Sequence, residues 1–415
     1  MKIKYPLLVI FLLTTLAVTK AQINIDSIFN RAIDLAKNQN YALAINNAQQ
    51  ALKYDAKRGD IMVFIANVYS WQTKNDSALL YIKEAQKINY RQDDFYEAWT
   101  NILLRSDKYS DLLATCNEAL SNNYSNTEDI IRKKMIAYDA LKRYDSGIGL
   151  IEQAENKKYL DSKPISELYT SMLLKRNTNV ISAYYTLDMF DSGFAPQHLA
   201  SLGYSFAVDE HNLGFRLNYA NRFGFNDVQL ETDFYLKLRN KHYIYLNYGY
   251  AFNATLFPLH RFGAEYYFPL PDKFEASIGG RYLDYTNSNV FIATGHLGKY
   301  IAKSWIAIRP FYVYKTPANN QSISMIANYR IFDKSELDYW GIELGFGNSP
   351  DDIYSTSQSG FNQLTAYKVK IEKNLMLSRT SDLHLALGYS REEYGTLSTQ
   401  FRNRFTTELG YKIRF

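Results

Sequence analysis

The chain has 415 residues and a mass of 48.1 kDa, a length that predicts two to three domains. Hydrophobic residues make up 47% and charged residues 21%, which excludes a disordered or low-complexity chain, and the net charge of +5 is too small to indicate a nucleic-acid partner. The single cysteine, Cys116, excludes an internal disulfide framework and a cysteine-based metal site.

The N-terminus has the three parts of a secretory signal peptide. Lys2 and Lys4 are basic, Leu7–Val18 is apolar, and Thr19–Ala21 supplies small residues for a cleavage site. An uncleaved anchor is the alternative, but the apolar run is short for one. We therefore expect residues 1–21 to be removed and the mature protein to leave the cytoplasm. No later apolar run approaches the roughly 18 residues of a spanning helix.

Residues 22–165 repeat with a period of 34 residues. Three sets of positions keep this step with small or apolar side chains: Ala44, Ala78 and Leu112; Ala48, Ile82 and Cys116; and Ala51, Ala85 and Ala119. The pattern resembles the tetratricopeptide repeat, in which small residues let two antiparallel helices pack closely. A weaker fourth copy around Tyr144 is displaced by one residue, as terminal repeats often are. The helix-ending proline of the family is replaced by Ala56 and Tyr90 in the first two copies.

The repeats predict an α-solenoid in the periplasm. A single helix pair cannot bury its own apolar face, so the copies stack and leave a concave groove that typically binds a peptide or a partner protein. Cys116 occupies a repeated core position, whereas a catalytic cysteine needs a basic and exposed setting. We therefore interpret Cys116 as a packing residue.

We predict a linker over residues 166–178, after which the period of the sequence changes from helical to two. In the last segment, apolar positions from Phe405 to Phe415 alternate with polar positions from Arg404 to Arg414. A dozen residues in a strand tilted by roughly 40° suffice to cross an outer membrane. Residues 179–415 are therefore predicted to form a transmembrane antiparallel β-barrel with apolar residues outside and charges inside.

About fourteen strands are expected. They cover residues 179–189, 197–209, 212–224, 226–239, 242–252, 258–270, 273–285, 289–302, 304–315, 319–332, 338–349, 362–376, 381–394 and 401–415. The alternation over 289–302 is ambiguous, so twelve strands remain possible. Alternate connections are short, as expected for periplasmic turns, and the connections at 251–258 and 347–362 are longer. A secreted β-sandwich is the alternative, but it would have shorter strands and fewer inward charges.

The C-terminus carries a further motif. Glu408, Gly410, Ile413 and the terminal Phe415 resemble the signal by which the barrel assembly machinery recognises outer-membrane barrels. With the repeats in front, residues 179–415 resemble the YaiO family of outer-membrane β-barrels. The layout is also similar, more distantly, to exopolysaccharide export porins that combine such repeats with a barrel. These resemblances imply an outer-membrane location and a non-enzymatic barrel.

Residues that could perform chemistry are sparse. No HExxH, GxSxG or phosphate-binding glycine-rich motif is present, so no catalytic residue, cofactor or metal site is predicted. His384 is expected to face the lumen near Asp382 and Glu392, where a lone histidine is more often a hydrogen-bonded wall residue than a base. Asp351 and Asp352 lie in the long outer loop, where a solvated acidic loop is the simpler interpretation.

The informative set is the lumen lining. By alternation it includes Arg216, Glu231, Asp233, Lys237, Tyr243, Tyr245, Arg261, Glu265, Arg281, Arg309, Arg330, Glu343, Lys368 and Lys370. Either the two signs of charge pair and fill the barrel, or the charges and inward tyrosines line a wet track for a glycan. About fourteen strands exceed the eight whose interior side chains alone can fill a barrel, which favours a pore.

Three functions are compatible with the sequence. The first is a non-enzymatic export channel for exopolysaccharide, with the repeats recruiting a periplasmic synthase or modifying enzyme. The second is a structural anchor that holds a partner at the membrane through the repeats. The third is an outer-membrane hydrolase. The expected partners are outer-membrane lipid, the barrel assembly machinery, a periplasmic protein and a glycan, with no nucleic acid.

Overall fold

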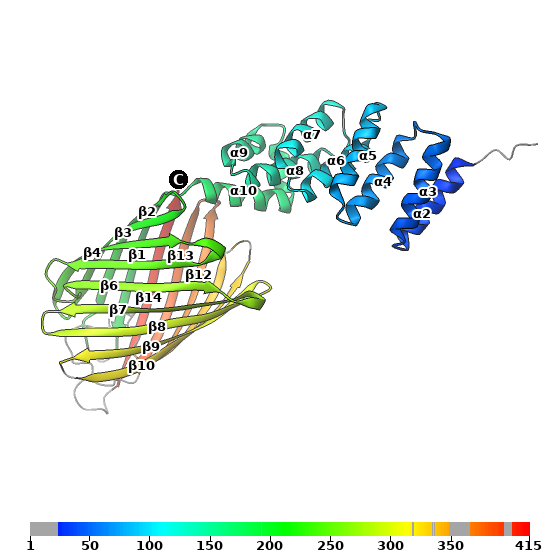
Figure 1. Cartoon of the computed structure of the whole chain (residues 1–415). Coiled ribbons are helices and arrows are strands. Elements are labelled where there is room, and N and C mark those ends of the chain that lie inside the picture. The colour runs from blue at the N-terminus through cyan, green and yellow to red at the C-terminus, as the bar shows by residue number, and fades with distance from the viewer. Residues whose placement is uncertain are drawn as a thin grey trace, which may run out of the picture. The chain divides into compact units, whose positions relative to one another are not determined.

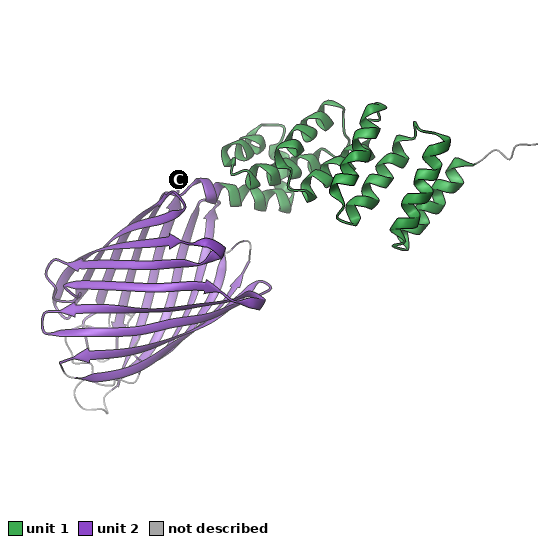
Figure 2. Cartoon of the chain, in the orientation of Figure 1, with its two compact units in different colours: residues 1–172 green, residues 173–415 purple. Residues whose placement is uncertain are grey.

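The computed structural model divides the chain into two compact units, residues 1–172 and 173–415 (Figure 2). The structure describes residues 24–191, 193–317, 319–333, 335, 337–347, 366–393 and 401–415. The predicted signal peptide lies outside these residues, as do Asp351 and Asp352 and most of the predicted loop 347–362.

The first unit is helical. Its helices are α2 (Ile25–Lys37), α3 (Tyr41–Tyr54), α4 (Gly59–Trp71), α5 (Asn75–Lys87), α6 (Asp93–Arg105), α7 (Tyr109–Ser121), α8 (Thr127–Ala140) and α9 (Tyr144–Glu152), followed by the short 3₁₀ helix η1 (Lys157–Asp161) and α10 (Lys163–Arg176). The described helices are not long and apolar enough for any of them to cross a membrane.

The helix boundaries reproduce the 34-residue period. The first helices of the four pairs begin at Ile25, Gly59, Asp93 and Thr127, and the second helices begin at Tyr41, Asn75, Tyr109 and, displaced by one residue, Tyr144. Ala44, Ala51, Ala78, Ala85, Cys116 and Ala119 are all fully buried between the helices. The predicted tetratricopeptide-like solenoid is therefore confirmed.

The predicted linker is wrong for most of its length. Residues 163–176 form helix α10, because Ile165, Tyr169 and Met172 give this segment an apolar face that is buried. Tyr169 also donates a hydrogen bond from its hydroxyl to Glu152 Oε1 at 3.0 Å. The absence of a fifth repeat in the sequence therefore did not mean the absence of a further packed helix.

The second unit is a β-barrel of fourteen antiparallel strands (Figure 1). The strands are β1 (Val180–Phe190), β2 (Gln197–Val208), β3 (His211–Arg222), β4 (Phe225–Lys237), β5 (Tyr243–Ala251), β6 (His260–Pro269), β7 (Phe274–Tyr285), β8 (Ser288–Ile301), β9 (Ser304–Thr316), β10 (Asn320–Phe332), β11 (Tyr339–Phe346), β12 (Ala366–Ser378), β13 (Ser381–Glu393) and β14 (Phe401–Arg414).

Each strand pairs with its neighbour in sequence, and β1 closes the barrel on β14 with Val180 opposite Arg414. We call the end of the barrel that holds these two residues the near end, and the opposite end the far end. Fourteen strands are confirmed over twelve, since β8 forms as a full strand. Its alternation was ambiguous because Val290 and Ile292, on the lumen face, are apolar and buried.

Alternation separates two surfaces of the barrel wall. Apolar side chains such as Phe215, Leu217 and Leu230 are exposed on the outer face, whereas their sequence neighbours Arg216 and Glu231 point inward. Closure satisfies the backbone hydrogen bonds of every strand, which is what a wall in contact with lipid requires.

Candidate functional site: the barrel lumen

The first lumen cluster is centred on Glu231, which is almost fully buried on β4. The Arg216 guanidinium contacts both Glu231 and Asp233, the latter at 3.4 Å. Asn247 Nδ2 donates to Glu231 Oε2 at 3.1 Å and to Asp233 Oδ1 at 2.9 Å, and Arg261 Nε donates to Asn247 Oδ1 at 3.0 Å. Arg216 therefore pairs with both carboxylates, and the Asn247 amide links them by hydrogen bonds to Arg261.

A second cluster links β6 to β9. Arg309 Nη1 donates to Glu265 Oε1 at 2.8 Å, and Ser277 also donates its hydroxyl hydrogen to Glu265. Ser277 Oγ lies 2.8 Å from His296 Nδ1 and accepts a hydrogen bond from the His296 backbone N–H at 3.0 Å. Glu275 Oε1 lies 3.5 Å from His296 Nε2. This Ser–His–Glu contact was not anticipated from the sequence.

The Ser277 hydroxyl is fully engaged in the described chain. A hydroxyl has one hydrogen and two lone pairs; here the hydrogen goes to Glu265, and the backbone and ring nitrogens of His296 lie against the oxygen. The residue is also 8% exposed. An activated serine instead needs its proton directed at the base and a free lone pair toward the substrate. The geometry is that of a wall hydrogen-bond network.

The opposite part of the wall, β10 to β14, has its own pairs. Lys368 Nζ lies 2.9 Å from Glu343, Lys370 Nζ lies 3.5 Å from Glu408, and Arg330 Nε donates to Glu372 at 3.0 Å. The ion pairs named here and above join strands at most three positions apart in the barrel order. They run along the wall and do not bridge the barrel.

The structure places the acidic partner of His384 differently from the sequence expectation. His384 Nε2 lies 3.5 Å from Glu408 Oε2. Asp382 instead pairs with Arg414, and Glu392 accepts from Arg402 Nε at 2.7 Å. The expectation was wrong because it counted neighbours along β13, whereas cross-strand register decides which carboxylate is near. No group of metal-ligating side chains occurs in the described part of the chain.

Exposure changes along the lumen. At the near end Tyr235 is 41% exposed, Lys237 and Lys241 are exposed, and Tyr243 and Tyr267 are half-buried. A pocket of about 460 Å³ is lined there by Lys241, Tyr243, Tyr267, Lys273, Glu275 and neighbours. The rings of Tyr243 and Tyr267 stack with centroids 4.4 Å apart. The near mouth is therefore open and aromatic.

At the far end the lumen-facing polar residues are buried. Arg222 Nε donates to Gln197 Oε1 at 2.7 Å, and Arg404 lies 3.7 Å from Glu392 and 4.0 Å from Asp188. Apart from Glu392, which was expected beside His384, sequence analysis did not single out the lumen residues of this end: Asp188, Gln197, Arg222, Asp227, Arg402 and Arg404. Strand parity would have placed all of them inside, because each has the parity of its strand's other lumen residues.

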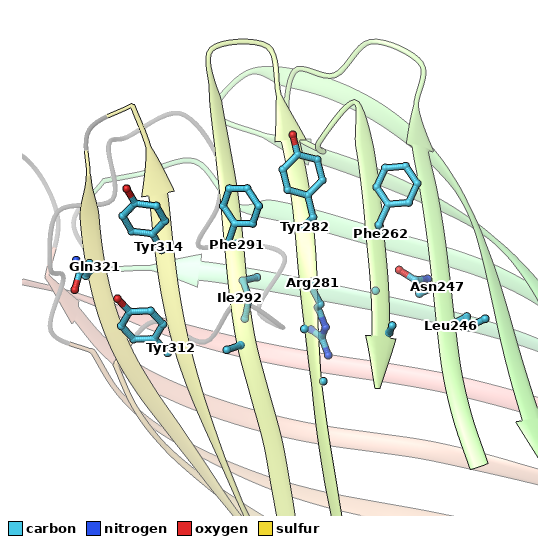
Figure 3. Close-up of a pocket in the computed structure, with 15 residues that line it drawn as sticks. Leu246, Asn247, Phe262, Arg281, Tyr282, Phe291, Ile292, Tyr312, Tyr314 and Gln321 are labelled. Atoms are coloured by element: carbon cyan, nitrogen blue, oxygen red, sulfur yellow. The ribbon is translucent and has the colours of Figure 1, made fainter. Parts of the chain in front are cut away.

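The outer wall carries aromatic rings near the far end. Figure 3 shows Phe262, Tyr282, Phe291 and Tyr314 on neighbouring strands around a pocket of about 1070 Å³. Ala264, Gly280 and Ala293 also line this pocket, and the ring centroids of Tyr282 and Phe291 are 4.9 Å apart. Such a row is typical of an aromatic girdle at the membrane interface.

A closed antiparallel barrel with an apolar, aromatic outer face and an ionised interior is an outer-membrane β-barrel, and this chain is one. Residues 178–352 match the family described as the YaiO membrane beta barrel domain, which confirms the resemblance predicted from the sequence.

Solved structures similar to parts of this chain include helical and barrel proteins. The outer membrane protein Omp33 of Acinetobacter baumannii is 13% identical, with a TM-score of 0.37 over 58% of this chain and 99% of that one. The KdgM porin in complex with disordered oligogalacturonate is 12% identical, with a TM-score of 0.29 over 56% and 99%. The type IV pilus biogenesis factor PilW is 17% identical, with a TM-score of 0.32 over 37% and 71%. No curated protein matches the sequence.

Proposed function

We propose that the protein is a non-enzymatic export channel for exopolysaccharide, entered from the near end, with the helical repeats recruiting a periplasmic synthase or modifying enzyme. The observation that carries this proposal is the open near mouth with its stacked tyrosines. An aromatic face packs against the apolar face of a sugar ring, while its hydroxyl edge remains hydrated.

The arrangement of charge supports passage of a hydrophilic polymer. Arg216, Arg309 and Lys368 pair with Glu231, Glu265 and Glu343 along the wall, between strands at most three positions apart. Paired charges and amides hydrogen-bond to hydroxyl groups but give no strong attraction for one sign of ion. A glycan therefore finds many weak contacts and no deep trap, as transport requires.

The absence of an enzyme activity belongs to this proposal. Ser277, His296 and Glu275 resemble a hydrolase triad in composition. The Ser277 hydroxyl is already engaged by Glu265 and His296, which argues against a role as a nucleophile. His384 contacts Glu408 and packs near the Tyr184 ring, with centroids 6.1 Å apart. These contacts are those of wall residues.

A structural anchor is the second candidate function. It is favoured by the buried polar residues of the far end, where Arg222 is 2% and Asp188 is 1% exposed. A barrel that stays closed there would serve only to hold the repeats and their partner at the membrane.

Single-channel recording of the full chain in planar bilayers tests the proposal. We expect ion conductance that is interrupted by oligosaccharides of neutral, amino and uronic series added on the near side. Replacing both Tyr243 and Tyr267 by alanine is expected to shorten the interruptions by about tenfold, the equivalent of 1.4 kcal/mol. Tyr266→Ala, which removes the adjacent ring from the outer face, is the matched control. A correctly folded barrel that never conducts would contradict the export channel and favour the structural anchor.

A further inference from the structure

The connection between β5 and β6, residues 252–259, folds into the barrel. Leu256 is 2% and Phe257 is 1% exposed, and both pack in one cluster with Ala220 and Ala251. Ala220 and Ala251 belong to the lumen-facing positions of β3 and β5. The loop therefore lies against the inner wall of the far end, where the sequence had predicted an ordinary outer connection.

One carboxylate holds this loop. Asp227 is fully buried on the lumen face of β4, and its Oδ2 accepts backbone hydrogen bonds from Thr255, Leu256 and Phe257 at 2.9, 2.8 and 3.0 Å. Its Oδ1 accepts from the Val228 backbone N–H at 2.9 Å. Hydrogen bonds to an ionised acceptor are the strong ones. Three of the four bonds anchor the loop.

Two other features of loop 252–259 and its surroundings disfavour its inward position. Ala254 has φ of +50°, the left-handed region that residues with a Cβ rarely adopt. Gln229, directly opposite Ala251 in the β4–β5 register, is fully buried, and its amide oxygen and nitrogen have no hydrogen-bond partner in the described chain. Water would reach that amide if the loop moved outward. The inward position thus depends on Asp227.

We propose that Asp227 is the positioning residue that sets the width of the far mouth, by holding loop 252–259 inside the barrel. This inference rests on the proposed channel. Loss of the carboxylate leaves three backbone N–H groups without their acceptor, and water outside the lumen replaces it. The loop then moves outward, and larger solutes pass.

The test measures conductance and the largest poly(ethylene glycol) that enters the pore, with the full chain in planar bilayers. Asp227→Ala is expected to raise both, and Asp227→Asn, which keeps one oxygen acceptor, to raise them less. Ala254→Gly relieves the strained φ without touching Asp227 and is expected to leave both at or below the wild-type values. Heat-modifiable gel mobility verifies that each barrel is folded.

A cysteine pair provides the converse test. Ala220→Cys with Leu256→Cys joins loop to wall under oxidation, which is expected to hold the size limit at its wild-type value even with Asp227→Ala, and reduction is expected to release it. An unchanged size limit in a conducting, folded Asp227→Ala barrel would contradict the proposal that Asp227 sets the width of the far mouth. It would not contradict the proposed channel function. If the wild type, Asp227→Ala and a variant with a shortened loop 252–259 all fail to conduct, the channel itself is overturned.

Discussion

Lys133 places a charged amine inside the helical unit. Its side chain is 1% exposed, and Nζ lies 2.6 Å from Asp129 Oδ2 and 2.8 Å from Thr100 Oγ1. A buried charge is tolerated only when it is paired and hydrogen-bonded. The ion pair lies within α8, and the hydrogen bond to Thr100 links α8 to α6 of the preceding repeat. The earlier copies hold alanine at the position of Thr100, at Ala32 and Ala66.

Truncation of Lys133 is expected to destabilise this unit. Lys133→Ala removes the stem and leaves a partly buried carboxylate with one partner fewer, a change that costs about 3 kcal/mol. Lys133→Met keeps the apolar stem, and Asp129 retains Arg132 at 2.6 Å, so we expect a smaller loss. Urea unfolding of the full chain, followed by helical circular dichroism, measures both. Equal stability of Lys133→Ala and wild type would contradict the structural role of the pair.

The pKa of Asp129 determines how part of the unfolding free energy of the helical unit depends on pH. Hydrogen bonds from Lys133 and Arg132 outweigh burial and hold the pKa of Asp129 below its ordinary value. Its stabilising contribution is therefore complete above about pH 4, the unfolded pKa, and is lost as pH falls through the folded pKa. The unfolding free energy should fall less steeply on acidification in Asp129→Asn than in wild type. Asp94, whose pKa burial raises, contributes with the opposite sign, and Asp94→Asn is the control.

The thiol of Cys116 is expected to be unreactive toward alkylation in the folded protein. Burial raises the pKa of its thiol to about 12, and the side chain is 0% exposed. Alkylation requires the thiolate and access to it. Iodoacetamide at pH 8 should therefore leave the native chain unmodified and label it fully in denaturant. Rapid labelling without denaturant would mean that the third repeat opens readily.

At the scale of one strand pair, Gly410 on β14 makes room for an aromatic ring. It lies directly opposite Tyr184 of β1, and a Cβ on Gly410 would overlap that ring. The two strands close the barrel, so their fit matters for the whole wall. The same glycine is part of the predicted insertion signal with Glu408, Ile413 and Phe415, which gives two different reasons for its presence.

A double mutant separates these reasons. Gly410→Ala is expected to lower the yield of heat-modifiable, folded barrel, because the methyl group displaces Tyr184. If packing is the cause, Tyr184→Ala in the same chain restores the yield. Gly214→Ala on β3 is the matched control, since its Cβ would come no closer than 3.4 Å to Ser205. Persistent failure of the double mutant would assign Gly410 to recognition by the assembly machinery.

Elements differ in how far the sequence predicts them. Strand ranges followed from parity, because each lipid-facing position must be apolar whatever the neighbouring strand is. The partners of lumen charges could not be predicted: Arg309 meets Glu265 three strands away, a relation set by register and barrel curvature. The inward position of loop 252–259 could not be predicted either, because the apolar character of Leu256 and Phe257 does not show which side of the barrel wall buries them.

At the scale of the molecule, the two units are stabilised in different ways: the helical unit by packing between neighbouring repeats, and the barrel by closure of its strands. The helical unit is built of repeats in which each helix pair packs on its sequence neighbours, as in the hydrophobic cluster that contains both Ala66 of α4 and Ala98 of α6. The barrel has no unpaired edge, because β1 and β14 bond to each other. In a membrane, opening it would expose backbone groups to hydrocarbon, which costs several kcal/mol for each group.

We therefore expect two separate unfolding transitions for the full chain in detergent or lipid. The helical signal at 222 nm should be lost at low urea, while the barrel keeps its heat-modifiable gel mobility to much higher urea. Lys133→Ala should move only the first transition and Gly410→Ala only the stability or yield of the barrel. A single transition detected by both probes, or a shift of both by Lys133→Ala, would show that the repeats and the barrel unfold as one cooperative unit.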